Sequence, residues 1–396
     1  MSRPIDVIVF SMSHYTDWQR GRVNRNYHIV EQLQGDERVG KVVTVDFLPW
    51  SWRKVAKIYW ENIIRPMADL EIVYGDLTSA CHKVNDRYFV YSTVDSIYAP
   101  QAVVGQLKRI SRILNLKNVV LWSYHPMFPH LLERVAQGEI GHTQFVFDAV
   151  DNWLSHPAYA GDRERLRRGY DRIARDADVV FTVNQHLAKT LFSQRIKPTM
   201  VVPNGVDFDH FAADRPIPPA LANLPRPIIG YHGIIESRFD AGLAVVVAGK
   251  MPEASFVYLG GNVWKSHRRA MAEAFHGLPN VHLLPFVSYQ ELPAYLGAFD
   301  AAFIPHQVND LTASMDPLKF YEYCAAGVPV VTTPVAGTAT FGSALRIART
   351  ADECVSQLRA ALRDTDRASR QALVKPHSWP TRVDQMLNLI LSSTNH

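Results

Sequence analysis

The sequence predicts an α/β protein made of two doubly wound, Rossmann-like domains, and three observations support this prediction. The chain has 396 residues, about twice the ~100–200 residues of a single domain. Short apolar runs rich in β-branched residues alternate with helical patterns, as in a parallel sheet covered by helices on both faces. A proline-rich segment interrupts this alternation near the middle of the chain, and the alternation restarts after it.

The composition is that of a globular protein. Hydrophobic residues make up 47% and charged residues 20% of the chain, which excludes a disordered or fibrous protein. The net charge of +4 is too small to indicate a nucleic-acid-binding protein. The three cysteines (Cys81, Cys324 and Cys354) show no CxxC spacing, so the cytoplasm is the expected compartment. Because no apolar stretch reaches the ~18 residues of a membrane-spanning helix, we expect a soluble protein, or one that lies on a membrane surface.

In the first half, helical spacing is found at residues 99–114 and 162–176, and apolar runs predict the strands around them. These strands are expected at Asp6–Ser11, Lys41–Phe47, Tyr88–Tyr91, Asn118–Ser123, Gln144–Phe147 and Val179–Val183.

The second half repeats the pattern after a break. Proline cannot continue a helix or a central strand, so the proline-rich residues 204–226 are expected to be a linker between domains 1–203 and 227–376, with a last helix within 377–396. Strands are expected at Pro227–Tyr231, Ser255–Leu259, Val281–Leu284, Ala301–Ile304 and Val328–Thr332.

The segment from Ser314 to Val331 specifies one short helix with both ends marked. Asp316 is a good N-cap, and Pro317 then falls at the first helical position, where its missing N–H costs nothing. Gly327 suits the left-handed residue at the end of the helix, and Pro329 prevents its continuation.

Two charged residues on this helix predict an anion site. Lys319 lies in the first turn, where the helix dipole disfavours a cation by ~0.3–1 kcal/mol. A phosphate at that N-terminus would reverse the effect, because the free N–H groups and the lysine would both face it. Glu322 lies one turn further on and is placed to accept hydrogen bonds from ribose hydroxyls. The alternative is an ordinary surface pair between Lys319 and Glu322 at i,i+3.

Two glycine turns follow strands of the same domain. Gly230 and Gly233 allow the backbone to approach a ligand closely, and Arg238, at the entry to the next helix, is suited to bind a diphosphate bidentately. Gly260 ends the next strand along the chain. Taken singly, Arg238 fits a solvated side chain better than a ligand contact. Glycines at the ends of strands commonly only turn the chain.

Four segments of the second half follow one another in the chain: the turn with Arg238, Leu259-Gly-Gly261, Val281–Phe286 and the helix after Lys319. In this order they resemble the donor domain of GT-B glycosyltransferases, most closely the family-four type (glycosyl transferases group 1). Residues 202–211 resemble the hinge of that group, and the helix beginning at Trp379 resembles the terminal helix that crosses back to the first domain.

The resemblance implies two domains facing a cleft, the first binding an acceptor and the second a nucleotide-sugar donor. It implies that Glu322 binds the ribose, as the second glutamate of a Glu-x7-Glu motif, and that Lys319 and Arg238 bind the diphosphate beside Gly233 and Gly260. Ser314 stands where the first glutamate of the motif is expected, which leaves Asn309 or Asp316 as candidates for contacts to the donor sugar. The resemblance favours retention of configuration at the transferred sugar.

The first domain offers candidates for handling the acceptor proton. Asp151 follows an apolar strand in Phe147-Asp-Ala-Val-Asp-Asn-Trp153 and is the preferred group, with Asp148 as its alternative and a turn cap as the simpler interpretation of each. His125 ends the preceding strand and is a second candidate. No essential metal and no cofactor are expected, because Lys319, Arg238 and the helix dipole would stabilise the leaving diphosphate.

Two basic segments mark where an acceptor or a membrane would bind. Phe47–Trp60 mixes tryptophans with cations, as interfacial helices do, and is interpreted as a membrane-facing or acceptor-binding element. Arg163–Arg175 is strongly cationic, although a solvated amphipathic helix explains it equally well. Anionic lipid attracts each such cation by ~1 kcal/mol, so a peripheral location on the inner face of the membrane is expected.

Together these features predict a metal-independent glycosyltransferase of cell-surface polysaccharide synthesis. Its donor would be a nucleoside-diphosphate sugar and its acceptor a lipid-linked or oligosaccharide molecule, with no nucleic-acid partner. Two alternatives remain open: a nucleotide-sugar epimerase of the same fold, and a catalytically silent nucleotide-binding partner subunit.

Overall fold

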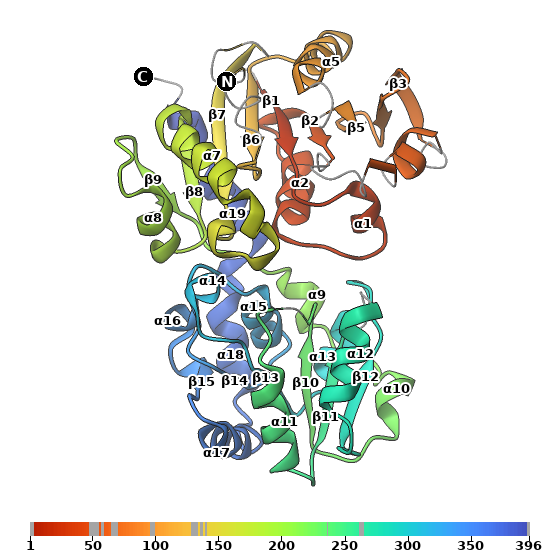
Figure 1. Cartoon of the computed structure of the whole chain (residues 1–396), viewed down its shortest axis with the longest axis vertical. Coiled ribbons are helices and arrows are strands. Elements are labelled where there is room, and N and C mark those ends of the chain that lie inside the picture. The colour runs from red at the N-terminus through yellow and green to blue at the C-terminus, as the bar shows by residue number, and fades with distance from the viewer. Residues whose placement is uncertain are drawn as a thin grey trace. The chain divides into compact units, whose positions relative to one another are not determined.

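The computed structural model forms two compact units (Figure 1), one of residues 1–202 with 383–396 and one of residues 203–382. It describes every residue outside the following ranges: 1–3, 47–54, 57–58, 65–69, 96–99, 128–133, 135–137, 139–140, 236, 261–264 and 394–396.

The first unit is built on a nine-stranded sheet with the order β3-β4-β5-β2-β1-β6-β7-β8-β9. Its strands are β1 (Ile5–Phe10), β2 (Val39–Val45), β3 (Glu71–Gly75), β4 (Ser79–Lys83), β5 (Tyr88–Thr93), β6 (Val119–Ser123), β7 (His142–Ala149), β8 (Val179–Thr182) and β9 (Thr199–Val201). Strands from β5 to β9 across this order pair in parallel, which confirms the predicted doubly wound architecture. The sequence analysis did not predict three of these strands. They are β9, at one edge, and β3 and β4, which extend the other edge in antiparallel pairing.

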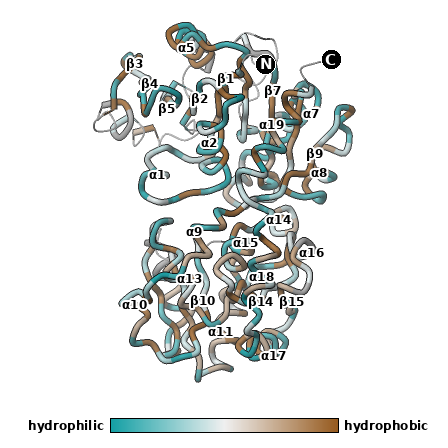
Figure 2. Tube along the Cα trace, turned by 180° about the vertical axis from the view of Figure 1, so that it is seen from behind, coloured by the Kyte–Doolittle hydropathy of each residue, from teal (hydrophilic) through white to brown (hydrophobic). Residues whose placement is uncertain are grey.

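Helices pack against this sheet and form the hydrophobic core with it. The helical segments of the first unit are α1 (Tyr15–Gln19), α2 (Arg25–Gly35), η1 (Tyr59–Ile64), α5 (Pro100–Ile113), η2 (Trp153–Ser155), η3 (Pro157–Asp162), α7 (Arg163–Asp176) and α8 (Gln185–Phe192). The core joins apolar residues of the central strands to the inner faces of α5 and α7, through residues such as Leu107, Leu121 and Ile173. Figure 2 shows the hydrophobic residues of β1 in brown on the trace.

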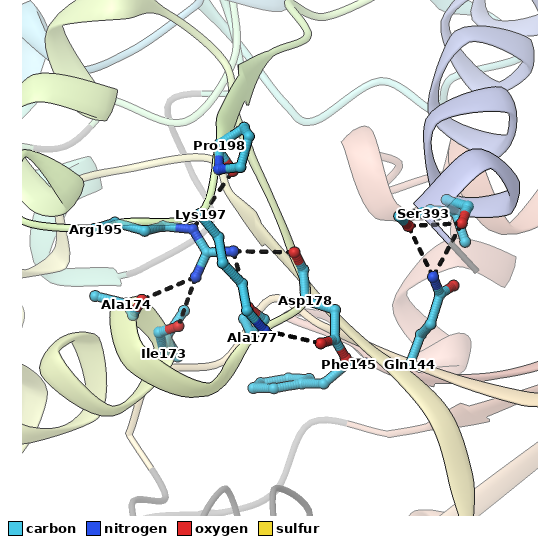
Figure 3. Close-up of polar contacts among 11 residues, drawn as sticks. Gln144, Phe145, Ile173, Ala174, Ala177, Asp178, Arg195, Lys197, Pro198 and Ser393 are labelled. Carbon is cyan, nitrogen blue, oxygen red and sulfur yellow. Dashed lines mark hydrogen bonds and ion pairs between the residues drawn. The ribbon is translucent and has the colours of Figure 1, made fainter. Parts of the chain in front are cut away.

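The C-terminal end of α7 is fixed by one arginine. The guanidinium of Arg195 donates hydrogen bonds of 2.8–3.3 Å to four backbone carbonyls, those of Ile173, Ala174, Ala177 and Asp178 (Figure 3). These include carbonyls that the end of the helix leaves without a helical partner. The carboxylate of Asp178 in turn accepts from the backbone N–H of Phe145 at 2.9 Å, so Arg195 also ties α7 to the sheet.

The second unit contains a six-stranded parallel sheet with the order β12-β11-β10-β13-β14-β15. Its strands are β10 (Ile228–His232), β11 (Ser255–Leu259), β12 (Val281–Leu284), β13 (Ala301–Ile304), β14 (Val330–Thr332) and β15 (Leu345–Ile347). All five predicted strands are present within two residues of the expected bounds, and β15 was not predicted.

Short helices surround this second sheet. They are α9 (Phe208–Ala212), α10 (Pro219–Ala222), α11 (Ala241–Gly249), α12 (Lys265–Ala274), α13 (Leu292–Gly297), α14 (Asp310–Ala313), α15 (Leu318–Ala325), α16 (Thr338–Phe341), η4 (Gly342–Ala344), α17 (Ala351–Ala361), α18 (Arg367–Val374) and η5 (Lys375–His377).

The proline-rich residues 204–226 lie within the second unit. His210, in α9, stacks on Tyr289 with ring centroids 4.4 Å apart, and its Nε2 lies 2.9 Å from the carbonyl oxygen of Tyr289. The segment is therefore packed onto the second unit by its own side chains.

The last helix, α19 (Trp379–Ser393), begins in the second unit, and its residues from Val383 onward belong to the first. In the first unit, the side-chain amide of Gln144 donates to the carbonyl oxygen of Ile390 at 3.0 Å and to Oγ of Ser393 at 2.8 Å (Figure 3). The end of the helix is therefore fixed beside β7. No helix within the described residues is long and apolar enough to cross a membrane.

Candidate functional site

Helix α15 begins one residue later than the sequence indicates. Pro317, not Asp316, occupies the N-cap position, and no side chain caps the helix. The carboxylate of Asp316 instead accepts hydrogen bonds from the backbone N–H of Asn204 at 2.6 Å and from the hydroxyl of Tyr321 at 3.0 Å. The predicted capping role of Asp316 is therefore wrong, because a tertiary contact with the segment before α9 takes its place.

The other end of α15 forms as predicted. Gly327 has a φ of +76°, and its N–H donates to the carbonyl of Cys324 while the N–H of Val328 donates to that of Tyr323. These two bonds form a Schellman motif, which satisfies the last carbonyls of the helix. With both ends fixed, the orientation of the first turn of α15 is set.

Lys319 is half-buried in that first turn and lies against the glycine turn after β10. A Cβ built on Gly233 would come within 2.8 Å of both Cε and Nζ of Lys319. The ammonium also lies 5.3 Å from the ring centroid of Tyr231, a cation–π distance. Desolvation and then the charge of Arg238 lower the pKa of Lys319 to about 8, against the opposing effect of Glu322. The side chain is thus a desolvated cation, not the surface residue of the alternative interpretation.

Glu322 lies one turn along α15 and is buried. Its Oε2 is 3.0 Å from Nε2 of His232, the last residue of β10. The surface pair with Lys319 that was weighed against a site is excluded by this burial. The two charged residues of α15 therefore both meet the carboxyl end of β10.

Arg238 follows β10 in the turn that leads to α11. Its Nη1 lies 4.0 Å from the sulfur of Met315, just before α15, and its charge acts on the pKa of Lys319. Its backbone carbonyl accepts from the N–H of Gln307 at 2.8 Å, which anchors the turn to the segment after β13. Two cations thus lie near the start of α15, where the helix dipole is also positive.

Gly260 brings the end of β11 to the same place. The N–H of Gly233 donates to the carbonyl of Leu259 at 3.0 Å, and a Cβ on Gly260 would lie 3.3 Å from the carbonyl oxygen of Gly233. Both glycines have positive φ, +119° and +89°. The structure therefore brings Gly233, Gly260, Lys319 and Glu322 together at the carboxyl ends of neighbouring strands, the usual ligand position in such folds.

The residues considered for the donor sugar have structural partners. Asn309 is the N-cap of α14, and its side chain accepts from the N–H of Thr312 at 3.1 Å. Ser314 is fully buried, and its hydroxyl donates to the carbonyl of Asp310 at 2.9 Å. Together with Asp316, these residues therefore each make hydrogen bonds within the second unit.

Two histidines of this region were not identified as site residues from the sequence. His232 contacts Glu322, and His306, which follows β13, lies 3.3 Å from the hydroxyl of Tyr231 through its Nε2. His306 is almost fully buried, and burial lowers its pKa well below the usual value, with further lowering by Lys319 and Arg238. Each follows or ends a strand at the site edge, the same signal that selected Gly233 and Gly260.

In the first unit, the structure separates the two aspartates of the predicted acid–base segment. Asp148 lies inside β7 with no exposure and accepts from Nε of Arg25 at 2.8 Å, in an ion pair buried on both sides. Asp151 follows the strand and is half-buried, and its backbone carbonyl accepts from the hydroxyl of Tyr170 at 3.4 Å. Of the two, Asp151 retains access to solvent.

His125 lies at the end of β6, the strand adjacent to β7. It is buried, its ring is edge-on to Trp153 with centroids 5.1 Å apart, and its Nδ1 accepts from the N–H of Met127 at 3.4 Å. His125 and Asp151 therefore extend from the carboxyl ends of adjacent parallel strands.

The structure also bears on the basic, aromatic segment Phe47–Trp60 and on possible metal ligands. Most of Phe47–Trp60 lies outside the described residues, although Trp60 itself is 55% exposed. Among the residues that the structure describes, no group of three or more histidine, cysteine, aspartate or glutamate side chains is arranged to hold a metal ion.

Residues 237–364 match the family described as glycosyl transferases group 1. The chain is also 23% identical over 235 residues to "Putative teichuronic acid biosynthesis glycosyltransferase TuaH" of Bacillus subtilis (strain 168), a match that spans 57% of each chain. The predicted family resemblance is thus confirmed for the segment that carries Arg238, Lys319 and Glu322.

Solved structures of glycosyltransferases share the fold of the whole chain. HepE of Anabaena, solved in complex with UDP and glucose, has a TM-score of 0.69 at 13% identity, over 98% of this chain and 100% of that one. Sucrose-phosphate synthase of Thermosynechococcus elongatus has a TM-score of 0.66 at 15% identity, over 99% of each chain. The trehalose-6-phosphate synthase OtsA has a TM-score of 0.65 at 14% identity, over 100% of this chain and 99% of that one. The predicted GT-B fold is therefore confirmed.

Proposed function

We propose that this chain is a GT-B glycosyltransferase that transfers a sugar from a nucleoside-diphosphate donor. The observation that carries the proposal is the half-buried, desolvated Lys319 in the first turn of α15, against Gly233 and near Arg238. A desolvated cation beside another cation is costly unless an anion joins it. A diphosphate supplies that anion and also accepts hydrogen bonds from the free N–H groups of the helix.

In this proposal each residue of the donor site has one task. Lys319 and Arg238 bind the diphosphate and stabilise the charge that develops as it leaves. Glu322 accepts hydrogen bonds from the ribose, and the turns at Gly233 and Gly260 let the backbone approach the nucleotide. These cations replace the metal ion that a nucleotide-sugar enzyme otherwise uses, so no metal or cofactor is needed.

We propose a uridine nucleotide as donor, because HepE shares the fold and is solved with UDP and with UDP-glucose. We propose a role in cell-surface polysaccharide synthesis, which the similarity to TuaH, named for teichuronic acid biosynthesis, supports. The proposed acceptor is a lipid-linked or oligosaccharide molecule at the inner face of the membrane. Asp151 would take the proton of the acceptor hydroxyl, with His125 on the neighbouring strand as a further contact.

Titration calorimetry with UDP tests the donor site directly. The variant Lys319→Met, which keeps the chain length but removes the charge, is expected to lose at least about tenfold in affinity, since a buried charge-assisted bond contributes ~1.5–3 kcal/mol. Lys250→Met is the matched control, because Lys250 is exposed and pairs with Asp352 on the surface. Equal UDP affinity in wild type and Lys319→Met would refute the proposal.

A further inference from the structure

His232 lies at the end of β10 and contacts the carboxylate assigned to the ribose. Its Nε2 is 3.0 Å from Oε2 of Glu322. Only 11% of the His232 side chain and 10% of the Glu322 side chain are exposed. The pair is thus shielded from bulk water but is not sealed from a ligand.

The next residue of α15 fixes the histidine in place. The hydroxyl of Tyr323 accepts a hydrogen bond from the backbone N–H of His232 at 2.9 Å. The two rings meet edge to face, with centroids 5.0 Å apart and an interplanar angle of 76°. Two consecutive residues of one helix, Glu322 and Tyr323, therefore hold the side chain and the backbone of His232, and the imidazole has little freedom to turn.

The protonation of His232 follows from its surroundings. Burial lowers its pKa and the charge of Lys319 lowers it further, while Glu322 opposes the shift. The imidazole is therefore neutral near pH 7 and carries one N–H. Nε2 and Oε2 lie 3.0 Å apart without the alignment of a hydrogen bond. Because an ionised carboxylate has no proton to donate, this approach is favourable only when the imidazole proton is on Nε2 and faces Oε2.

We propose that His232 is a positioning residue for Glu322: its Nε2–H holds Oε2 and leaves Oε1 oriented to accept from the ribose hydroxyls of the donor. The inference rests on the proposed function, which assigns the ribose to Glu322. It adds a consequence for specificity. Because Oε1 of Glu322 is already held in place, little conformational entropy is lost when the ribose binds. A nucleotide that lacks the 2′-hydroxyl leaves this oxygen desolvated and without a hydrogen-bond partner, and it should therefore bind more weakly.

The test is calorimetry with two probes, UDP and 2′-deoxy-UDP, on wild type and on His232→Phe and His232→Gln. Phenylalanine keeps the ring but has no N–H, whereas the side-chain amide of glutamine restores a donor near the position of Nε2. Wild type is expected to prefer UDP by about tenfold or more, since each 1.4 kcal/mol is tenfold in affinity. His232→Phe should lose most of this preference, and His232→Gln should recover part of it.

Two further measurements separate positioning from a merely structural role. Thermal unfolding should show that all variants fold, and transfer assays should show a raised donor KM with kcat nearly unchanged, as for lost uniform binding. His276→Phe, an exposed histidine of the same unit, is the matched control and should keep the wild-type preference.

The outcomes distinguish the inference from the function on which it rests. If wild type binds neither nucleotide, the proposed function itself fails. If wild type binds UDP but His232→Phe keeps the full preference, or loses affinity for both nucleotides equally, then His232 does not position Glu322 and the inference is wrong while the proposed function stands.

Discussion

The ammonium of Lys319 lies so close to Gly233 that a Cβ built on the glycine would come within 2.8 Å of Nζ. The glycine has a φ of +119°, which L side chains rarely adopt. The backbone conformation therefore favours glycine, and any side chain at this position would displace the end of the lysine.

The first prediction concerns Gly233→Ala. The methyl group would push Lys319 out of its position and strain the backbone, at a cost of about 1–3 kcal/mol in the free energy of unfolding. We expect UDP affinity to fall together with stability, measured by calorimetry and by chemical denaturation. Gly297→Ala is the control, because its Cβ would have no atom within 4 Å. Unchanged UDP binding in Gly233→Ala would show that Lys319 does not act from this position.

A second prediction follows from the pKa of Lys319, which is about 8 because burial and Arg238 disfavour its charge. Below pH 8 the lysine is protonated and attracts the diphosphate. Above pH 8 the free protein loses this proton, so binding must take one up, and UDP affinity should fall by up to about tenfold per pH unit. Calorimetry from pH 7 to 9.5, in buffers of different ionisation enthalpy, measures both the affinity and the proton uptake.

The variant Lys319→Met gives the comparison for this pH dependence. It should bind UDP weakly and with little change between pH 7 and 9.5, because the titrating group is gone. A decline of the same slope in wild type and Lys319→Met would assign the titration to another group.

Much of the fold was predictable because its central strands are long apolar runs. The strands β11, β12 and β13 begin and end at the expected residues. In β11 and β13, which are fully buried, burial on both faces leaves few polar positions. By contrast, β15 has three residues, and β3 includes Glu71 and ends at Gly75. Such segments become strands through pairing with a neighbour, and this tertiary contact leaves no local pattern in the sequence.

In the candidate site, too, residues with a local sequence signal were predictable and residues set by tertiary contacts were not. Lys319 was identifiable because a cation in the first turn of a helix contradicts the helix dipole. Asp316 was misassigned because its competing partner, Asn204, lies 112 residues earlier in the chain. The position of His232 at the end of a strand was visible in the sequence, but its contact was not, since only the fold brings the end of β10 to within 3.0 Å of Glu322.

A third prediction is that removing divalent ions leaves transfer intact. Lys319, Arg238 and the N-terminus of α15 already supply positive charge for the leaving diphosphate. Dialysis against EDTA should therefore change neither UDP affinity nor the rate of sugar release from a UDP-sugar. A loss of activity that Mg²⁺ or Mn²⁺ restores would show that a metal ion takes part.

The last prediction separates the two aspartates at the end of β7. Asp148 is fully buried against Arg25, so Asp148→Asn leaves a buried arginine without its counter-charge, and we expect a loss of about 3–5 kcal/mol in the free energy of unfolding. Asp151 is half-buried beyond the strand. The conservative change Asp151→Asn should therefore alter stability by no more than about 0.5 kcal/mol, while kcat for transfer falls by about 10²–10⁴-fold if the carboxylate takes the acceptor proton.

Chemical denaturation and transfer kinetics on both variants decide the assignment, with UDP affinity as the check that the donor site is intact. The proposed donor site lies in the second unit, so UDP affinity should be unchanged in Asp151→Asn. A stable Asp151→Asn enzyme with full kcat would remove Asp151 from the chemistry. Because Asp148 is paired with Arg25, the acceptor proton would then have to go to another group. His125, which follows the adjacent strand β6, is the next candidate.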